Sequence, residues 1–85
     1  MKPARLLARL LDGQVTNVAF ADLVRLLLAL GFQEVGGKGS HRVFARPGVT
    51  DLVNLQEDGG QAKSYQARQV ASLARRYALK VEDHE

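Results

Sequence analysis

Hydrophobic residues recur at helical spacing in two segments near the start of the chain. In residues 3–12 the apolar positions share one helical face, and Gly13 ends the pattern. These apolar residues are Leu6, Leu7, Leu10 and Leu11. They predict a short amphipathic helix that must pack on another element. Residues 18–31 have few polar side chains, so they predict a largely buried helix that begins after Asn17, a possible N-cap. This helix should end at a glycine C-cap followed by an apolar residue that folds back onto the last turn, Gly31 and Phe32.

The middle of the chain predicts β-strands separated by glycine-rich and Pro-Gly turns. The predicted strands are residues 33–37, 42–46 and 51–56. Connections this short allow only an antiparallel meander. Alternation directs Val53 and Leu55 inward on the third strand. On the second strand, Val43 and Phe44 point to opposite faces, and either could be the core residue. We prefer Phe44, which puts His41 on the other side of the sheet.

The last third of the chain predicts a loop followed by a closing helix. Residues 57–61 combine acidic residues with two glycines, which is typical of a loop. From about Ser64 to Ala78, small apolar residues recur on one face, and Ser64 is a plausible N-cap. Residues 81–85 should fray, and His84 in this acidic tail should be solvated.

This order of elements predicts an α+β fold in which two helices cover one face of a three-stranded antiparallel sheet. The opposite face stays open for binding. Double-stranded-RNA-binding domains share the order α-β-β-β-α, and they recognise RNA largely by its shape and phosphates. Fold analogy alone does not assign a function. We expect residues 1–85 to form one domain, in which residues 1–13 are an additional N-terminal helix.

The composition is that of a soluble globular protein, since 46% of the 85 residues are apolar and 25% are charged. The chain has no cysteine, which excludes a disulfide framework and a thiolate metal site. No apolar run approaches the roughly 20 residues of a membrane-spanning helix. The first residues also lack the pattern of a secretory signal. We therefore expect a cytoplasmic protein that does not enter a membrane.

The formal net charge is +3, and the excess lies in the middle of the chain. Residues 36–76 contain seven lysines and arginines but only three acidic residues. Such a distribution favours an anionic partner, although an arginine-lined solvated helix would give the same pattern.

One short motif carries candidate chemistry. His41 stands within Gly-Lys-Gly-Ser-His-Arg, residues 37–42. An imidazole exchanges protons near neutral pH and neighbouring cations bind phosphate, so the motif suits an enzyme that acts on a phosphodiester. Gly39 either serves a turn or lets a phosphate approach the backbone. The alternative is an exposed histidine without a catalytic role, beside cations on a solvated strand face. Those cations are Lys38, Arg42 and Arg46.

A second candidate contact lies where the last helix begins. Lys63 and the helix N-terminus could bind another phosphate, and Tyr65 could stack on a base. Both residues could equally be cap and packing residues. Other chemistries fit poorly, because the histidines and carboxylates lack metal-ligand spacing and the chain has neither a phosphate-binding loop motif nor a nucleophile elbow. We expect no metal and no other cofactor.

Several motifs in the same order resemble the HicA family of toxin ribonucleases. The first are Asp22-Leu23 through Leu30-Gly31-Phe32 and Lys38-Gly39-Ser40-His41-Arg42-Val43-Phe44. The later ones are Asn54-Leu55-Gln56, Gly59-Gly60, Ala62-Lys63, Tyr65-Gln66 and Arg68-Gln69-Val70. They are similar to a HicA subgroup that usually has proline where this chain has Ser64, and serine still suits a helix start. The resemblance covers about residues 17–79.

The resemblance implies the toxin of a type II toxin–antitoxin system, an endoribonuclease that cleaves mRNA. It implies a HicB-type antitoxin as partner, with which the chain could form a hetero-oligomer. It also implies that His41, after Gly39-Ser40, is the catalytic histidine. Around it, the residues that we expect to contact RNA are Lys38, Gly39, Ser40, Arg42, Arg46, Lys63 and Tyr65.

Two alternatives from other functional classes remain. A non-catalytic RNA-binding module would use the same basic face but would not cut RNA. A vestigial toxin would act as a protein-interaction domain, with the leucine face of residues 6–11 docked on a partner.

Overall fold

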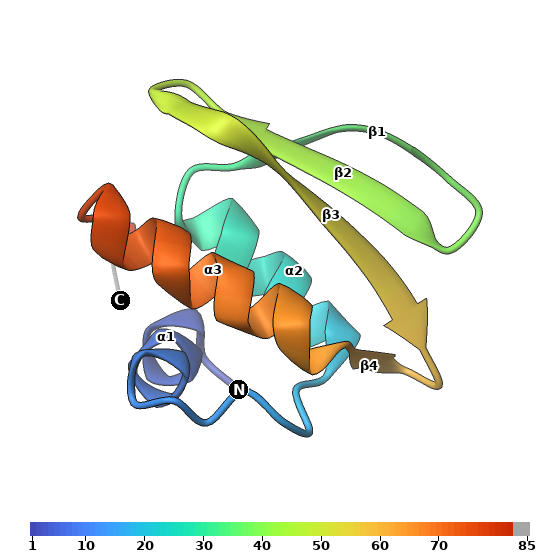
Figure 1. Cartoon of the computed structure of the whole chain (residues 1–85), viewed down its shortest axis with the longest axis horizontal. Helices are drawn as coiled ribbons and strands as arrows, with labels where there is room; N and C mark the ends of the chain where they lie inside the picture. The colour runs from blue at the N-terminus through green and yellow to red at the C-terminus, as the bar shows by residue number, and fades with distance from the viewer. Residues whose placement is uncertain (83–85) are drawn as a thin grey trace.

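The computed structural model describes residues 1–82, which form three helices and four strands (Figure 1). Their bounds are α1 Pro3–Leu11, α2 Phe20–Ala29, β1 Gln33–Lys38, β2 His41–Arg46, β3 Val49–Asp58, β4 Gln61–Ala62 and α3 Ser64–Arg76. The strands form one antiparallel sheet in the order β1-β2-β3-β4. The predicted α+β fold is confirmed, with one strand more than expected.

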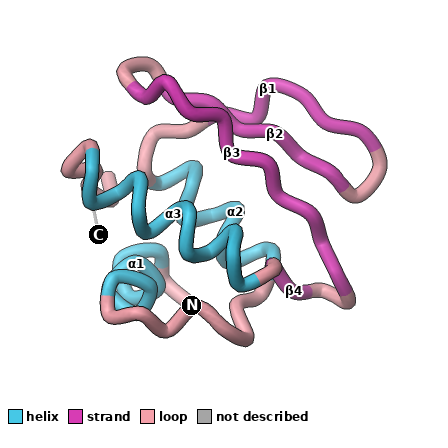
Figure 2. Tube along the Cα trace, in the orientation of Figure 1, coloured by secondary structure: helices cyan, strands magenta, loops and turns pink. Residues whose placement is uncertain are grey.

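The helices and the sheet form separate layers. Helices α2 and α3 lie on the same side of the sheet, and α1 packs on both helices on the side away from it (Figures 1 and 2). No helix or strand within residues 1–82 covers the opposite face of the sheet (Figure 1). None of the helices within residues 1–82 combines the length and apolarity needed to cross a membrane.

One hydrophobic core joins the layers. Phe44, Val53 and Leu55 are completely buried, so the predicted inward residues of β2 and β3 are confirmed. The amphipathic helix α1 contributes Leu6 and Leu10, each about 1% exposed. Most of the leucine face is therefore used inside the molecule, which weighs against a role as a partner surface.

The predicted loop over residues 57–61 is wrong. Strand β3 continues to Asp58, and β4 pairs back on it with Glu57 opposite Ala62. Gly59 and Gly60 form the connection and have φ values of 59° and 81°. A two-residue hairpin turn of type I′ needs positive φ at both central residues, which glycine adopts without strain. The turn formed by these two glycines lets the chain pair back on β3, which adds a fourth strand to the sheet.

The start of α2 also differs from the prediction. The helix begins at Phe20 after the N-cap residue Ala19, so Asn17 is not the cap. The preceding segment is extended because it pairs with the hairpin: the Val18 carbonyl accepts a hydrogen bond from the Ala62 N–H. The Phe20 N–H donates to the Gly60 carbonyl. This pairing across the chain overrides the local capping signal.

The end of α2 agrees with the prediction. Gly31 has a φ of 94°, and its N–H donates to the Leu28 carbonyl at 3.0 Å. The Phe32 N–H donates to the Leu27 carbonyl at 3.0 Å, and the Phe32 side chain is buried. This is a Schellman cap with its apolar contact.

The last helix is shorter than predicted at its C-terminal end. Lys63 is its N-cap and Ser64 its first residue, and the helix ends at Arg76. Ala78 has a φ of 51° and is exposed, so it does not belong to the buried face. Of the tail predicted to fray, Val81 packs partly on the core and the Glu82 N–H donates to the Ala29 carbonyl. The rest of the tail, including His84, lies outside the described residues.

Candidate functional site

His41 lies on the uncovered face of the sheet at the start of β2. Its cross-strand partners are Lys38 on β1 and Gln56 on β3. Residues opposite each other in antiparallel strands point to the same face, so the three side chains form a row across the end of the sheet. The buried Phe44, three residues later, points toward the helices instead. The His41 side chain is exposed and makes no hydrogen bond or ion pair within residues 1–82. An imidazole in this state is free to engage a ligand.

Gly39 and Ser40 form the turn that joins β1 to His41. Gly39 has a φ of 64°, which explains its place in a tight turn. A Cβ at Gly39 would meet no atom within 4 Å, so the space above the turn is open. The Ser40 carbonyl accepts a hydrogen bond from the Glu57 N–H at 3.3 Å, which ties the turn to β3. Both glycine interpretations from the sequence are compatible with this geometry.

Gly37 brings β1 unusually close to the backbone of His41. Its φ is 132°, and a Cβ added there would lie 2.3 Å from the His41 carbonyl oxygen and 2.9 Å from the Arg42 Cα. Only glycine permits this approach. From the sequence, Gly37 is assigned only to the motif and to the glycine-rich turns between strands, and this close approach is not predicted, although a glycine pair inside a strand is a signal of close backbone contact.

Arg42 lies on the opposite side of the sheet from His41. Its guanidinium donates to both carboxylate oxygens of Glu34, at 2.9 and 2.7 Å. The same group lies 5.8 Å from the ring centroid of Phe20 and 5.6 Å from that of Phe44. These hydrogen bonds hold the pKa of Glu34 below its ordinary value and raise the pKa of Arg42. Arg42 therefore faces α2 and does not join the row that contains His41.

Arg46 lies at the far end of β2 from His41. The two positions are five residue steps apart along the strand, which is about 16 Å at the usual rise of a β-strand. The Arg46 Nε donates to the Leu30 carbonyl at 2.8 Å, and Nη1 donates to the Pro47 carbonyl at 3.1 Å. A cation on the last carbonyls of α2 stabilises the helix end. The geometry thus gives Arg46 a capping contact remote from His41.

The start of α3 is fixed beside the end of β3. The Gln66 side chain is about 2% exposed, and its Oε1 accepts from the N–H groups of Gln56 at 3.3 Å and Lys63 at 3.4 Å. Because Gln56 is the cross-strand partner of His41, Gln66 connects the start of α3 to the row on the open face. Gln66 belongs to the sequence motifs, but its positioning role depends on contacts that the motifs do not reveal.

Lys63 and Tyr65 lie at this helix start. The Lys63 Nζ is 3.7 Å from a carboxylate oxygen of Asp58, and the Tyr65 side chain is 59% exposed. The helix start, the β1–β2 turn and the β3–β4 turn all lie at the same end of the molecule (Figure 1). That end therefore carries His41, Lys38, Lys63 and an exposed aromatic ring.

The arrangement suits proton transfer next to an anion. An accessible imidazole can take or give a proton, and nearby ammonium groups can hold a phosphate. Within the part of the chain that the structure describes, no group of three or more His, Cys, Asp or Glu side chains is placed to hold a metal ion.

Comparison with known protein families gives one result that bears on this site. A family model described as HicA toxin of bacterial toxin-antitoxin matches residues 20–75, from the start of α2 to the last turn of α3. The matched span contains His41 and the start of α3, and α1 lies outside it. Comparisons with curated proteins and with solved structures gave no match.

Proposed function

Since this chain belongs to the HicA family of toxins from bacterial toxin–antitoxin systems, we propose that it is an endoribonuclease that cleaves mRNA and that His41 is its general acid or base. The observation that carries the proposal is the unbonded, exposed imidazole beside Lys38 on the uncovered face of the sheet. A core histidine would be buried and hydrogen-bonded instead.

The proposed reaction needs one proton-transfer group and a cation. His41 removes the proton from the ribose 2′-hydroxyl next to the scissile phosphate, or protonates the leaving oxygen. Lys38 and Lys63 stabilise the charge that develops on the phosphoryl oxygens. General acid–base catalysis of this kind contributes roughly 10²–10⁴-fold. A slow enzyme is expected, and slow cleavage is sufficient for toxicity if all cellular mRNA is a target.

The neighbouring residues receive supporting roles. Gly39 and Ser40 keep the β1–β2 turn narrow, so that a phosphate can approach the backbone of these two residues, which directly precede His41. Tyr65 offers an exposed ring on which a base can stack. Arg42 and Arg46 form hydrogen bonds within the protein. They stabilise the sheet and the end of α2, respectively, and do not contact the scissile phosphate.

The proposed partner is a HicB-type antitoxin that forms a hetero-oligomer with the toxin in the cytoplasm. Inhibition requires that the antitoxin deny RNA access to His41. The uncovered sheet face around His41 is therefore the surface that we expect the antitoxin to block.

Induced expression in bacteria tests this function. Wild-type protein should arrest growth and deplete mRNA, and His41→Ala should do neither at equal protein levels. His84→Ala, the same substitution at the other histidine of the chain, should remain toxic. Growth arrest by His41→Ala with undiminished mRNA loss would exclude His41 as the catalytic group.

One observation favours the alternative of an RNA-binding module without catalysis. Within residues 1–82, His41 is the only histidine, and no second proton-transfer group bonds to it. Incubation of labelled RNA with excess protein separates the two functions, because a binding module retards the RNA without shortening it. Cleavage should persist in the presence of a chelator, since the proposed chemistry uses no metal ion.

A further inference from the structure

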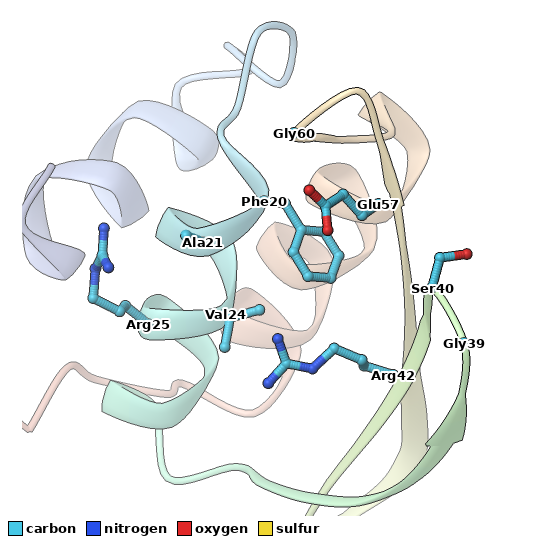
Figure 3. Close-up of a pocket in the computed structure, with 9 residues that line it drawn as sticks. All are labelled: Phe20, Ala21, Val24, Arg25, Gly39, Ser40, Arg42, Glu57 and Gly60. Atoms are coloured by element: carbon cyan, nitrogen blue, oxygen red, sulfur yellow. The ribbon is translucent and has the colours of Figure 1, made fainter.

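A hollow of about 410 Å³ lies on the helix side of the sheet, next to the turn that precedes His41 (Figure 3). It is enclosed by the first turns of α2, by the β1–β2 turn and by the end of β3. Phe20 and Val24 provide apolar walls, and Gly39 and Ser40 form the rim nearest His41. The volume is suitable for a small planar group, because ligand pockets begin at roughly 300 Å³.

The hollow contains an uncommitted carboxylate. The Glu57 side chain is exposed and forms no hydrogen bond or ion pair within residues 1–82. Figure 3 shows its carboxylate beside the Phe20 ring. Its charge contributes to the raised pKa of Arg42, after the larger effect of the Glu34 hydrogen bonds. Glu57 is therefore close enough to Arg42 to interact with it, yet its oxygens remain available to a ligand.

The cations of the hollow are held in place. Arg42 is fixed by its two hydrogen bonds to Glu34. The Arg25 guanidinium donates to Asp22 at 2.5 Å and is directed away from Phe20 and Glu57 (Figure 3), so it contributes charge near the rim and no donor inside the hollow. A guanidinium group has five N–H donors, so Arg42 keeps donors that Glu34 does not use. The hollow thus offers an available acceptor in Glu57, fixed donors on Arg42 and an apolar wall within one small space.

We propose that this hollow is a binding subsite for a guanine base of the RNA, which rests on the ribonuclease function proposed above. Guanine has two adjacent N–H donors that a carboxylate can accept together. On its other side it has two acceptors, O6 and N7, which arginine recognises more often than any other base edge. None of adenine, cytosine and uracil combines these two features. The flat purine ring would lie against Phe20 and Val24.

The hollow lies next to the turn that precedes His41, so one strand of RNA could contact the hollow and His41 at the same time. Gly39 and Ser40 rim the hollow and directly precede His41. Because Gly39 has open space above it, the RNA backbone can cross the turn with a phosphate on the His41 side and a base on the hollow side. A basic side chain of a protein partner could also pair with Glu57. It could not use the donors of Arg42, and it would lie against the like charge of that arginine.

Binding of uncleavable RNA tests the subsite separately from catalysis. The probes are 2′-O-methylated pentanucleotides with uridine at every position except the centre, which carries each of the four bases in turn. Fluorescence anisotropy at one salt concentration gives the four affinities. The guanine oligonucleotide should bind at least about fivefold more tightly than the others, the lower end of the discrimination given by one bidentate base contact. Amide resonances of Gly39, Ser40 and Gly60 should shift on binding.

Glu57→Gln provides the decisive variant, because it keeps the size of the side chain and removes the bidentate acceptor. The preference for guanine should disappear in this variant and persist in Glu82→Gln, a matched change at an exposed residue outside the hollow. Equal affinities in the wild type, or a preference that survives Glu57→Gln, would overturn the subsite. So would an oligolysine peptide that shifts these amides when none of the oligonucleotides does. Failure of the wild type to cut ordinary RNA would count against the proposed function alone, since these probes cannot be cut.

Discussion

Replacement of Gly37 by alanine probes the contact that sets the position of the His41 backbone. The added methyl group would lie 2.3 Å from the His41 carbonyl oxygen and 2.9 Å from the Arg42 Cα. Both colliding atoms belong to the backbone of β2, so no side-chain rotation can relieve the overlap. Strands β1 and β2 must move apart at the residue proposed to carry the chemistry.

The expected cost has two parts. An alanine held at a φ of 132° is strained, which costs about 1–3 kcal/mol. Overpacking against atoms that cannot yield costs a further 1–3 kcal/mol or so. We therefore expect Gly37→Ala to lower the free energy of unfolding by about 2–6 kcal/mol. For a domain of this size, the lower end of that range already corresponds to a fall in the melting temperature of about 8–16 °C.

Urea denaturation of Gly37→Ala and Gly36→Ala provides the comparison. Gly36 is the neighbour on the same strand, and a Cβ there would meet no atom within 4 Å. Its replacement should change the free energy of unfolding by no more than about 1 kcal/mol. Cleavage activity per folded molecule should fall in Gly37→Ala and persist in Gly36→Ala. Equal stability of the two variants would refute the close approach of β1 to His41.

Three further predictions concern charge and packing. Hydrogen bonds from Arg42 hold the pKa of Glu34 below its ordinary 4.5. The ionised carboxylate therefore stabilises the fold above pH 4.5, and this contribution is lost as the pH falls through the lowered pKa of the folded protein. Glu34→Gln should therefore flatten the acid limb of a plot of unfolding free energy against pH, and an unchanged limb would contradict the pairing. Lys38→Ala should weaken binding of single-stranded RNA of any sequence and reduce the slope of log affinity against log salt by about 0.7–1; an unaltered slope would remove Lys38 from the RNA contact. Leu6→Ala should cost about 2–5 kcal/mol because this side chain is 1% exposed, whereas Leu11→Ala, at a position 37% exposed, should cost much less in the same urea titration.

Much of the fold follows from local patterns. The helix end at Gly31 and Phe32 was predictable because a Schellman cap uses only residues within the last turn and just beyond it. The inward positions Val53 and Leu55 follow from strict alternation along one strand. The choice between Val43 and Phe44 also proved correct, since Phe44 is completely buried.

The errors occur where distant segments meet. Asn17 has the chemistry of a helix cap, but the residues after it pair with β4, and this pairing delays the helix to Phe20. The Gly59-Gly60 pair predicted a loop. It forms a hairpin turn because Glu57 pairs with Ala62, and the two glycines alone do not indicate that pairing. Neither outcome is decided by the residues themselves. Both depend on the edge of the sheet that the rest of the chain provides.

The candidate site was predictable in part. The choice of Phe44 as a core residue already implied that Arg42, two positions away, shares its face and is separated from His41. Its ion pair with Glu34 depends on the register of β1 against β2, which the sequence does not specify. Gln66 and the hollow beside Glu57 each require contacts among several elements, so no local motif could indicate them.

The most direct test of the account measures cleavage of labelled mRNA by purified wild type and His41→Ala, with enzyme in excess over RNA. We expect the variant to keep its thermal stability and its affinity for RNA, because the imidazole is exposed and makes no bond within residues 1–82. We expect its rate of cleavage to fall by roughly 10²–10⁴-fold. If the folded His41→Ala protein cuts RNA at the wild-type rate, His41 is not the catalytic group and the account is wrong.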